Sequence, residues 1–345
     1  MARLIDVARA AGVSRSTVSN VFNNPDVVRS ELRERVEAAA RELGYLGPDP
    51  TARLLRAGKV NAVGVLPPAE LAVAESIRNP VFRLFLSGVA EACDEVGANL
   101  LIVPDRTSHQ GIRNAVVDGF IFGRVEHLRE VEPARLRRLP FAVVDFDPGP
   151  AINSVWVDSR AGAYAAAKHL TDLGHRRFGI LSFFRGHGPA RLHPAGQERR
   201  PDAFGMPTDE EKYRGYAAAL AEVGIDIAAV PMVQADPWTP DAAPMLLDVA
   251  ADATAILTMG VMQAIAILAE ARRRGFRAPR DLSVVGYNDI AEAESCDPPL
   301  TTVDGMGVEK GRAAARLVFA GGPPRHQILQ PRLIVRGSTG PPPTH

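Results

Sequence analysis

A short polar segment near the amino terminus carries side chains that could recognise bases in DNA. Residues 18, 21 and 22 are apolar and fall at helical spacing, which predicts one buried face. The start and outer face of this helix would carry Arg15, Ser16, Ser19 and Asn20. Arginine can donate two hydrogen bonds to guanine, and asparagine can pair with adenine, as a helix in the major groove requires. The alternative is an ordinary polar surface on a small helical bundle, and periodicity alone leaves both open.

Two short helices would position these side chains. The first is predicted over residues 5–11 and ends at Gly12, and Ser14 can cap the second by accepting a hydrogen bond from a backbone N–H. Two short helices joined by a glycine turn form the helix-turn-helix pattern. A third helix is predicted from Ser30 to Gly44. Its apolar face would consist of Leu32, Val36, Ala39 and Leu43.

The residues after the third helix predict a linker that is helical only with a partner. Pro48, Pro50 and Gly58 interrupt this segment. About two helical turns fit between Pro50 and Gly58, and a helix that short is marginal in water. We therefore expect residues 48–60 to order on docking and to join a head, residues 1–47, to the rest of the chain.

Three motifs in this region together resemble the DNA-binding head of LacI/GalR-type bacterial transcriptional repressors. They are LIDVARAAGVSRSTVSNVFN, ELRERVEAAARELGY and ARLLRAGK, in that order within residues 3–59. The resemblance implies that the second helix enters the major groove. It assigns base contacts to Arg15, Ser16 and Asn20, and it places Thr17 and Ser19 nearer the phosphates.

The same resemblance implies that residues 48–60 fold into a hinge helix on operator DNA. The residues implied to touch DNA from this helix are Ala52, Arg53 and Leu55. Leu55 of each subunit would wedge into the minor groove, at a cost of roughly a few kcal/mol in unstacking that added contacts repay. Leu54 is a competing assignment, because the proline-containing lead-in looks one residue longer than in some relatives. A plain core pair of Leu54 and Leu55 is the other alternative.

The charge of the chain is distributed unevenly. The whole sequence has 40 Lys+Arg and 40 Asp+Glu, so no global excess of cations attracts it to phosphate. Residues 1–60 hold ten Lys/Arg and seven Asp/Glu, a charge of +3, which leaves −3 on the remainder. DNA binding would therefore rest on a local surface and on two heads acting together.

The cysteines and the amino terminus favour a cytoplasmic protein that does not enter a membrane. Cys93 and Cys296 are far apart and match no disulfide or zinc pattern. Arg3, Asp6 and Arg9 interrupt the region where a secretory signal would need an apolar core. The longest uncharged stretch, the 17 residues 253–269, is interpreted as a buried strand running into a helix.

From residue 61 onward, short apolar runs alternate with helical patterns. Seven runs are predicted to be buried strands of parallel sheets, over 62–66, 99–103, 119–122, 141–145, 178–182, 255–259 and 282–287. Helix starts are predicted at Asn79-Pro80 and at a capping box formed by Thr208 and Glu211. This alternation predicts a doubly wound α/β architecture, and about 285 residues suffice for two lobes with a ligand cleft between them.

Several runs here resemble the effector-binding half of the same family, which has the fold of periplasmic sugar-binding proteins. They include VVDGFIF, SVWVDSRAGAYAAAKHLTDLGHRRFGILS and DLSVVGYNDI. The implied fold is a small all-α helix-turn-helix head joined by a hinge helix to an α/β core of two doubly wound parallel-sheet lobes. The expected lobes are residues 61–153 with about 304–322, and 154–303 with about 323–340. Residues 183–207 lie outside the resemblance and are expected to form an exposed loop beside the cleft.

The resemblance also implies four effector-binding positions, Asp145, Lys212, Trp238 and Asn288. A polar side chain at a strand's carboxyl end faces the crevice, and tryptophan offers a flat apolar face with one donor. The structural alternatives are that Asp145 caps a helix and Trp238 covers a lobe surface. Lys212 replaces the arginine usual in relatives, and Gly260-Val261 replaces a Ser-Asp or Asn-Asp pair. The lost carboxylate puts a simple pyranose in doubt and permits a less hydroxylated ligand or a repressor without an effector.

Signals for catalysis are weak. Six of the eight histidines fall within residues 109–193 but form no metal-ligand pattern, and no nucleophile or nucleotide-binding motif follows a strand. We expect no metal, no cofactor and no enzymatic activity. The sequence favours a cytoplasmic repressor that binds a pseudo-palindromic operator in double-stranded DNA as a homodimer, with a tetramer left open, under control of a sugar or nucleoside-like effector. The alternative is a cytoplasmic small-molecule-binding α/β protein or enzyme whose N-terminal helices mediate protein interaction.

Overall fold

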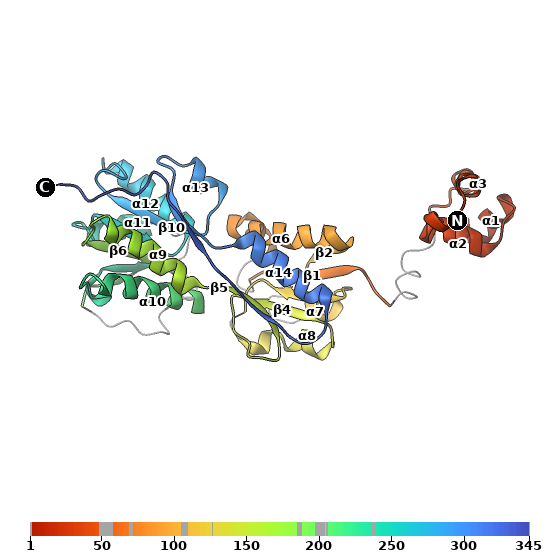
Figure 1. Ribbon diagram of the computed structural model, residues 1–345, viewed down its shortest axis with the longest axis horizontal. Helices are drawn as coiled ribbons and strands as arrows, with labels where there is room; N and C mark the ends of the chain where they lie inside the picture. The colour runs from red at the N-terminus through yellow and green to blue at the C-terminus, as the bar shows by residue number, and fades with distance from the viewer. Residues whose placement is uncertain are drawn as a thin grey trace. The chain divides into compact units, whose positions relative to one another are not determined.

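The computed structural model divides into two compact units, Met1–Val60 and Asn61–His345. The residues that it describes are 2–47, 58–68, 72–104, 110–125, 127–184, 188–196, 204, 206–235, 239 and 241–344. Each unit is considered by itself, and Figure 1 labels their elements.

The smaller unit is the predicted helix-turn-helix head. Its elements are α1 (Leu4–Ala10), α2 (Arg15–Asn23), the short 3₁₀ helix η1 (Pro25–Val27) and α3 (Ser30–Glu42). The Ser14 side chain caps α2 by accepting a hydrogen bond from the Thr17 backbone N–H at 3.1 Å. Gly12 has a φ of +63°, a conformation that favours glycine, and so permits the tight turn between α1 and α2. Val7, Val18 and Val36, one from each α-helix, are fully buried together and hold the three helices against one another.

The larger unit contains two sheets whose central five strands have the same order. The first sheet runs β12-β5-β4-β3-β1-β2, and the second runs β13-β11-β10-β9-β6-β8-β7. In each sheet the first strand of the lobe lies inside the sheet, β1 between β2 and β3 and β6 between β8 and β9, which is the doubly wound arrangement. We call the first sheet with its helices the N-lobe and the second sheet with its helices the C-lobe. The predicted two-lobed α/β fold is thus confirmed.

The N-lobe sheet is covered on both faces. Its strands are β1 (Ala62–Leu66), β2 (Asn99–Ile102), β3 (Gly119–Phe122), β4 (Phe141–Val144), β5 (Asn153–Val157) and β12 (His326–Leu329). Its helices are α5 (Val73–Arg78), α6 (Pro80–Val96), α7 (Gln110–Asn114), η2 (Leu128–Glu130), α8 (Glu132–Leu136) and α14 (Gly307–Ala320). Helices α6 and α14 pack on one face, where Ile121 belongs to their shared core. On the other face the Arg137 guanidinium, just after α8, lies over the Phe120 ring.

Helices α6 and α14 approach each other closely because glycines face both ways at their crossing. A Cβ added at Gly88 would lie 1.8 Å from the Val308 carbonyl oxygen, and one at Gly311 would lie 2.0 Å from the Phe85 carbonyl oxygen. Backbone atoms occupy the space that a side chain would need, so neither position tolerates one without a shift of a helix.

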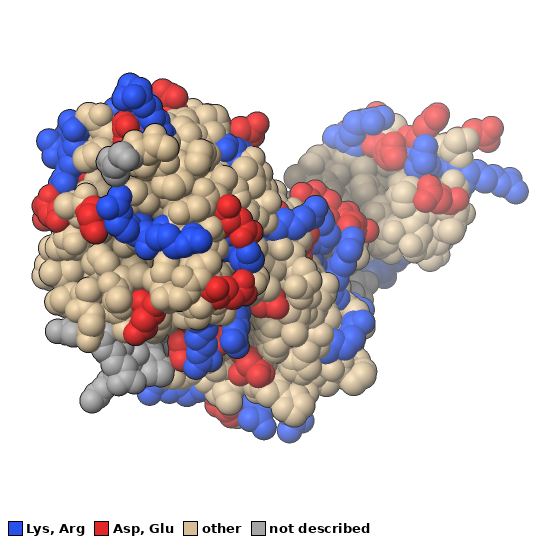
Figure 2. All heavy atoms as spheres, turned by 60° about the vertical axis from the view of Figure 1, so that its left-hand side comes forward, with Lys and Arg blue, Asp and Glu red and all other residues tan. Residues whose placement is uncertain are grey.

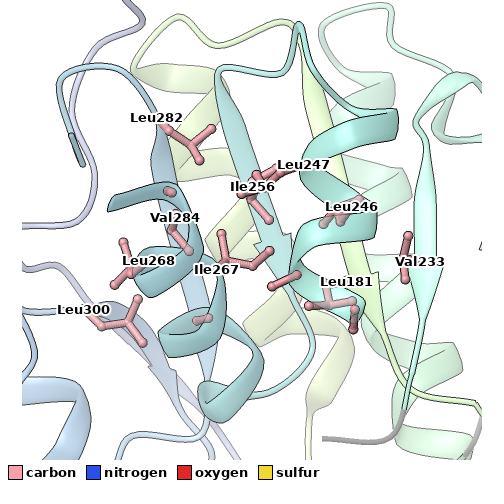
Figure 3. Close-up of a cluster of buried hydrophobic side chains, with 14 of the residues drawn as sticks. Leu181, Val233, Leu246, Leu247, Ile256, Ile267, Leu268, Leu282, Val284 and Leu300 are labelled. Carbon is pink, nitrogen blue, oxygen red and sulfur yellow. The ribbon is translucent and has the colours of Figure 1, made fainter. Parts of the chain in front are cut away.

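The C-lobe sheet is a layer between two helix pairs. Its strands are β6 (Phe178–Ser182), β7 (Arg191–His193), β8 (Met232–Gln234), β9 (Ala255–Thr258), β10 (Ser283–Tyr287), β11 (Thr301–Asp304) and β13 (Arg332–Ile334). Its helices are α9 (Ser159–Asp172), α10 (Pro207–Ala221), η4 (Ile227–Ala229), α11 (Ala242–Val249), α12 (Val261–Arg273) and α13 (Ala291–Ser295). Strand residues alternate between the two faces, since Ile180 packs in the α9–α10 core, whereas Leu181 packs in the α11–α12 core, which Figure 3 shows.

The chain passes between the lobes three times, after β5, after β11 and after β12. Strand pairing moves two expected boundaries. Residues 154–157 and 326–329 were expected in the C-lobe, but β5 pairs with β4, and β12 pairs with β5, so both strands belong to the N-lobe. The reason is that β5 would otherwise leave the backbone N–H and C=O groups of its outer edge unpaired, and β12 pairs with them in parallel.

The carboxyl-terminal segment is fixed to the C-lobe by a buried histidine. His175 is fully buried, with Nδ1 2.9 Å from the Thr254 hydroxyl and Nε2 2.8 Å from the Gly340 carbonyl oxygen. Since the Gly340 carbonyl can only accept, Nε2 donates to it. Burial lowers the pKa of His175, which favours its neutral form.

Two local predictions for the C-lobe were wrong. The proposed capping box of Thr208 and Glu211 is not formed, because α10 already begins at Pro207, with Met206 as an N-cap that makes no side-chain cap. Residues 183–207 are not simply a loop, since β7 within them pairs antiparallel with β8 at the edge of the sheet.

The surface charge and the length of the helices relate to the predictions on DNA attraction and on membrane insertion. Lys and Arg are interspersed with Asp and Glu on the face shown in Figure 2, in keeping with a formal net charge of zero. Within the described residues, no helix is long and apolar enough to cross a membrane.

Candidate functional site

The exposed face of α2 presents the polar side chains that the sequence singled out. Val18 and Val21 are buried in the head core, whereas Arg15, Ser16 and Asn20 are exposed. Within residues 2–47, the side chains of Arg15 and Asn20 make no hydrogen bond or ion pair. Their donor and acceptor groups are therefore available for a partner.

The hydroxyl groups on α2 are already engaged locally. Ser14 Oγ lies 2.7 Å from Ser16 Oγ and 2.8 Å from Thr17 Oγ1 at the start of the helix. One turn further on, Asn23 donates a hydrogen bond from Nδ2 to Ser19 Oγ at 3.1 Å. A contact with phosphate or base from Ser16, Thr17 or Ser19 would share or replace these hydrogen bonds.

Four sequence-predicted site residues lie outside the described residues. They are Ala52, Arg53 and Leu55 of the linker and Trp238 after β8. Leu54, the competing wedge, lies outside them as well.

Asp145 and Asn288 occupy equivalent places in the two lobes. Asp145 follows β4 and Asn288 follows β10, and these strands hold the same position in their sheets. Both residues are left-handed, with φ of +55° and +71°. Each donates its backbone N–H to the next strand, Asp145 to the Val155 carbonyl at 3.0 Å and Asn288 to the Val303 carbonyl at 2.8 Å. Asp and Asn tolerate this conformation better than other residues with a side chain, which explains their presence at these strand ends.

The two side chains differ in what they can offer a ligand. The Asp145 carboxylate forms a half-buried ion pair with Lys310 of α14, so part of its charge is already neutralised. The Asn288 amide makes no hydrogen bond within the part of the chain that the structure describes. Its Oδ1 lies directly against Gly305, where an added Cβ would be 2.0 Å away. Asn288 is therefore the freer of the two.

Lys212 lies in the C-lobe beside the ends of β6 and β9, but its ammonium group is fully engaged. Nζ donates to Asp209 Oδ1 at 3.2 Å and to the Met259 carbonyl oxygen at 3.0 Å. It also lies 4.5 Å from the centroid of the Tyr287 ring, a cation–π contact. With 8% of its side chain exposed, Lys212 is a buried partner of other residues rather than an open cation.

Asp209 is a buried carboxylate that the sequence reasoning missed. Its side chain is 1% exposed, and Oδ2 has no hydrogen-bond partner in the described structure. Burial raises the pKa of Asp209, while Lys212 and the Arg124 guanidinium, which follows β3 in the N-lobe, act in the opposite direction. The Asp209 carboxylate therefore interacts electrostatically with one cation from each lobe. Its spacing of three residues from Lys212 on one helix was a signal that could have indicated the pair.

The glycine that replaces a polar residue after β9 leaves room for an aromatic ring. A Cβ on Gly260 would lie 2.5 Å from Cζ of Phe183, so the Phe183 ring occupies the space that a side chain there would take. The same ring lies 6.0 Å from Lys212 Nζ. Phe183 and Tyr287 thus give this side of the C-lobe an aromatic character. Burial raises the pKa of Tyr287, which keeps its hydroxyl protonated.

Comparisons with known proteins agree with this two-part organisation. A family model described as bacterial regulatory proteins, lacI family, matches residues 3–47, and one for a periplasmic binding protein-like domain matches residues 167–339. The chain is 33% identical to an HTH-type transcriptional regulator of Mycolicibacterium smegmatis, covering 99% of this chain and 97% of that protein. It is 30% identical to the HTH-type transcriptional repressor CytR of Escherichia coli K12, covering 98% and 96% respectively.

Solved structures show the same fold. A transcriptional regulator CelR–cellobiose complex has a TM-score of 0.66 at 25% identity, with 98% of this chain and 100% of that chain covered. The lac repressor dimer bound to operator and the anti-inducer ONPF has a TM-score of 0.77 at 23% identity, with 98% and 99% covered. The chain belongs to the lacI family of bacterial regulatory proteins, and it is a DNA-binding transcriptional regulator.

Proposed function

We propose that this protein is a repressor that binds a pseudo-palindromic operator as a homodimer, with α2 of each head in the major groove. The observation that carries this proposal is the exposed pair Arg15 and Asn20, whose side chains have no partner within the head of a lacI-family chain. Arg15 is assigned to a guanine and Asn20 to an adenine in each half-site, because their hydrogen-bonding groups match those bases. Ser16 adds a base contact, and Thr17 and Ser19 bind near the phosphates.

The linker completes this proposal. Residues 48–60 form the hinge, Ala52 and Arg53 contact the DNA, and Leu55 wedges between bases in the minor groove. The low charge of the head favours a dimer, because one mildly basic head alone gains little from non-specific attraction to phosphate. Replacing Leu55 with Ala is expected to reduce DNA bending in a circular-permutation gel assay, and the same bending in the variant would remove Leu55 from this role.

A small molecule that binds between the lobes is proposed to control operator affinity. The equivalent strand-end positions of Asp145 and Asn288 support this part of the proposal, as does the position of Lys212 at the end of β9. The related CelR structure contains cellobiose, which supports a sugar-like class of ligand. The mechanism requires that effector and operator favour different conformations of the core, so that binding of one shifts the population away from the other.

The decisive experiment is an operator selection from random double-stranded DNA with the full-length protein, followed by affinity measurements at several salt concentrations. Arg15→Ala should relax preference at one position in each half-site and weaken operator binding by roughly 1–3 kcal/mol if the contact is a bidentate one. Arg41→Ala serves as a control, since Arg41 is an exposed cation at the end of α3 and its loss should leave base preference unchanged. Equal affinity of the wild-type protein for every sequence would contradict the proposal.

A further inference from the structure

We infer that the effector of this protein presents a hydrogen-bond donor, foremost an amino or ammonium group, to Asp209 on the C-lobe side of the site. This inference rests on the proposed effector function and names the chemical class of its ligand. It follows from which polar atoms at this site remain without a partner and which are already satisfied.

Two of the unsatisfied atoms in this region are acceptors on the C-lobe side. Asp209 Oδ2 and Gln263 Oε1 are buried and have no hydrogen-bond partner within the described residues. The orientation of the Gln263 amide is fixed, because Nε2 donates to the Ser182 carbonyl oxygen at 2.9 Å and a carbonyl can only accept. Buried acceptors without a donor are costly, so both oxygens gain from a ligand that donates.

The cation beside them is not available to a ligand. Lys212 uses its ammonium group on Asp209 Oδ1, the Met259 carbonyl oxygen and the face of the Tyr287 ring. An anionic ligand, such as a phosphorylated sugar, would have to displace one of these contacts and would also approach the Asp209 carboxylate. The Asp209–Lys212 pair therefore disfavours an anionic ligand and favours a ligand that donates a hydrogen bond.

The position of these groups in the fold is that of a ligand site. Ser182 ends β6 and Met259 follows β9, two neighbouring strands whose connections run in opposite directions along the sheet. Ligands of doubly wound sheets bind outside the carboxyl ends of the strands at such a switch point. Arg124 follows β3 at the corresponding switch point of the N-lobe, and its guanidinium is near enough to lower the pKa of Asp209. Arg124 and Asp209, one from each lobe, therefore interact electrostatically at this site.

Asp209 also supplies a carboxylate to a site where the residues after β9 provide none. Gly260 and Val261 supply no acceptor after β9, and Phe183 fills the space beside Gly260. The carboxylate comes instead from the first turn of α10. A donor-bearing ligand with a flat apolar part satisfies both Asp209 and the Phe183 ring.

The test is a calorimetric and thermal-shift comparison of matched pairs in which one member carries an amino group where the other carries a keto or hydroxyl group, with the full-length wild-type protein. The probes are cytidine against uridine, adenosine against inosine, glucosamine against glucose, and glucose 6-phosphate as the anionic member. We expect the amino member of at least one pair to bind about 10-fold or more tightly than its partner, as a hydrogen bond to a buried charged acceptor predicts. Glucose 6-phosphate should not bind more tightly than glucose.

The variant Asp209→Asn gives the sharpest outcome. It places an amide where the carboxylate was, so the open position can become a donor, and the preference within the binding pair should be lost or reversed toward the member without the amino group. Glu211→Gln, two residues further along α10 and exposed, is the matched control and should keep the wild-type preference. If Asp209→Asn fails to fold by circular dichroism, the wild-type panel alone decides.

Equal affinity within every pair, tighter binding of glucose 6-phosphate, or no binding by any probe would overturn the inference. Operator binding by the same preparation is measured in parallel. Failure of the ligand prediction with intact operator binding refutes only the donor class, whereas loss of sequence-specific DNA binding refutes the proposed function itself.

Discussion

The buried pair Asp209–Lys212 allows a quantitative test of how this protein tolerates charge in its C-lobe. Replacing Asp209 with Ala removes the carboxylate and leaves the Lys212 ammonium with 8% of its side chain exposed. Breaking a buried ion pair from one side typically costs about 3–5 kcal/mol, because the remaining charge is uncompensated. Lys212 would keep its hydrogen bond to Met259 and its contact with the Tyr287 ring, which is worth up to about 2 kcal/mol when desolvated. We therefore expect the lower end, a loss of about 3 kcal/mol in the free energy of unfolding.

A second pair on the same helix provides the control. Glu211 and Arg214 have the same spacing of three residues, but their side chains are 39% and 50% exposed. Exposed pairs contribute about 0–1 kcal/mol, so Glu211→Ala should change stability by less than about 1 kcal/mol. The double variant Asp209→Ala/Lys212→Met should recover most of the stability that Asp209→Ala loses, because no unpaired charge remains.

Urea denaturation followed by far-ultraviolet circular dichroism measures these differences at constant protein concentration. Comparable m-values among the variants would show that the same cooperative transition is being followed. If Asp209→Ala were no more destabilising than Glu211→Ala, or if Lys212→Met in the double variant restored nothing, the buried pair would not have the energetic role assigned to it.

Two further predictions concern the C-lobe. Burial lowers the pKa of His175 below its unfolded value of about 6.5, so the stability that its neutral form provides above that pH should fall as the pH drops from about 6.5 toward the folded pKa. The variant His175→Gln should therefore show a smaller difference in urea midpoint between pH 7 and pH 5 than the wild-type protein. An unchanged difference would count against this assignment. Leu246→Ala, at a fully buried position in the core of Figure 3, should cost about 2–5 kcal/mol by thermal or urea unfolding, whereas Val249→Ala at a 37% exposed position of the same helix should cost less than about 0.5–1 kcal/mol. Similar losses in both would mean that the α11–α12 core is more plastic than its burial indicates.

Much of this fold was predictable because its central strands are apolar on both faces. The runs 62–66, 119–122 and 178–182 coincide with β1, β3 and β6, and their buried neighbours explain why. The fold of the head was equally predictable, since Val18 and Val21 fall at helical spacing and Ser14 caps the helix as expected.

Several of the strands that the sequence analysis missed lack that apolar signal. β12 is exposed over His326, Gln327 and Ile328, and β13 begins with an exposed arginine. Their pairing is decided by partners far away in the chain, β5 and β11, and not by local composition. β11 contains buried threonines that pair in the middle of a sheet, which a hydrophobicity pattern does not reveal.

The candidate site divides in the same way. Asp145 and Asn288 were predicted because polar residues at strand ends face the crevice, whichever side chains lie across from them. Asp209 was not, because Pro207 and Thr208 suggested a helix start with a solvent-exposed cap, and only tertiary packing makes the carboxylate buried. Lys212 was predicted to bind the effector, but its ammonium group is already engaged for the same reason. Two of its three partners are distant in sequence, namely Met259 after β9 and Tyr287 in β10.

The three passages of the chain between the lobes have a consequence for synthesis in the cell. Helix α14 and strand β12, which complete the N-lobe, are encoded after nearly all of the C-lobe. A nascent chain that has emerged only through β5 would expose the apolar face of Val144 and Val155 that α14 later covers. The lobe nearest the amino terminus would thus be among the last parts to finish folding, contrary to the usual order in which amino-terminal domains fold first during translation.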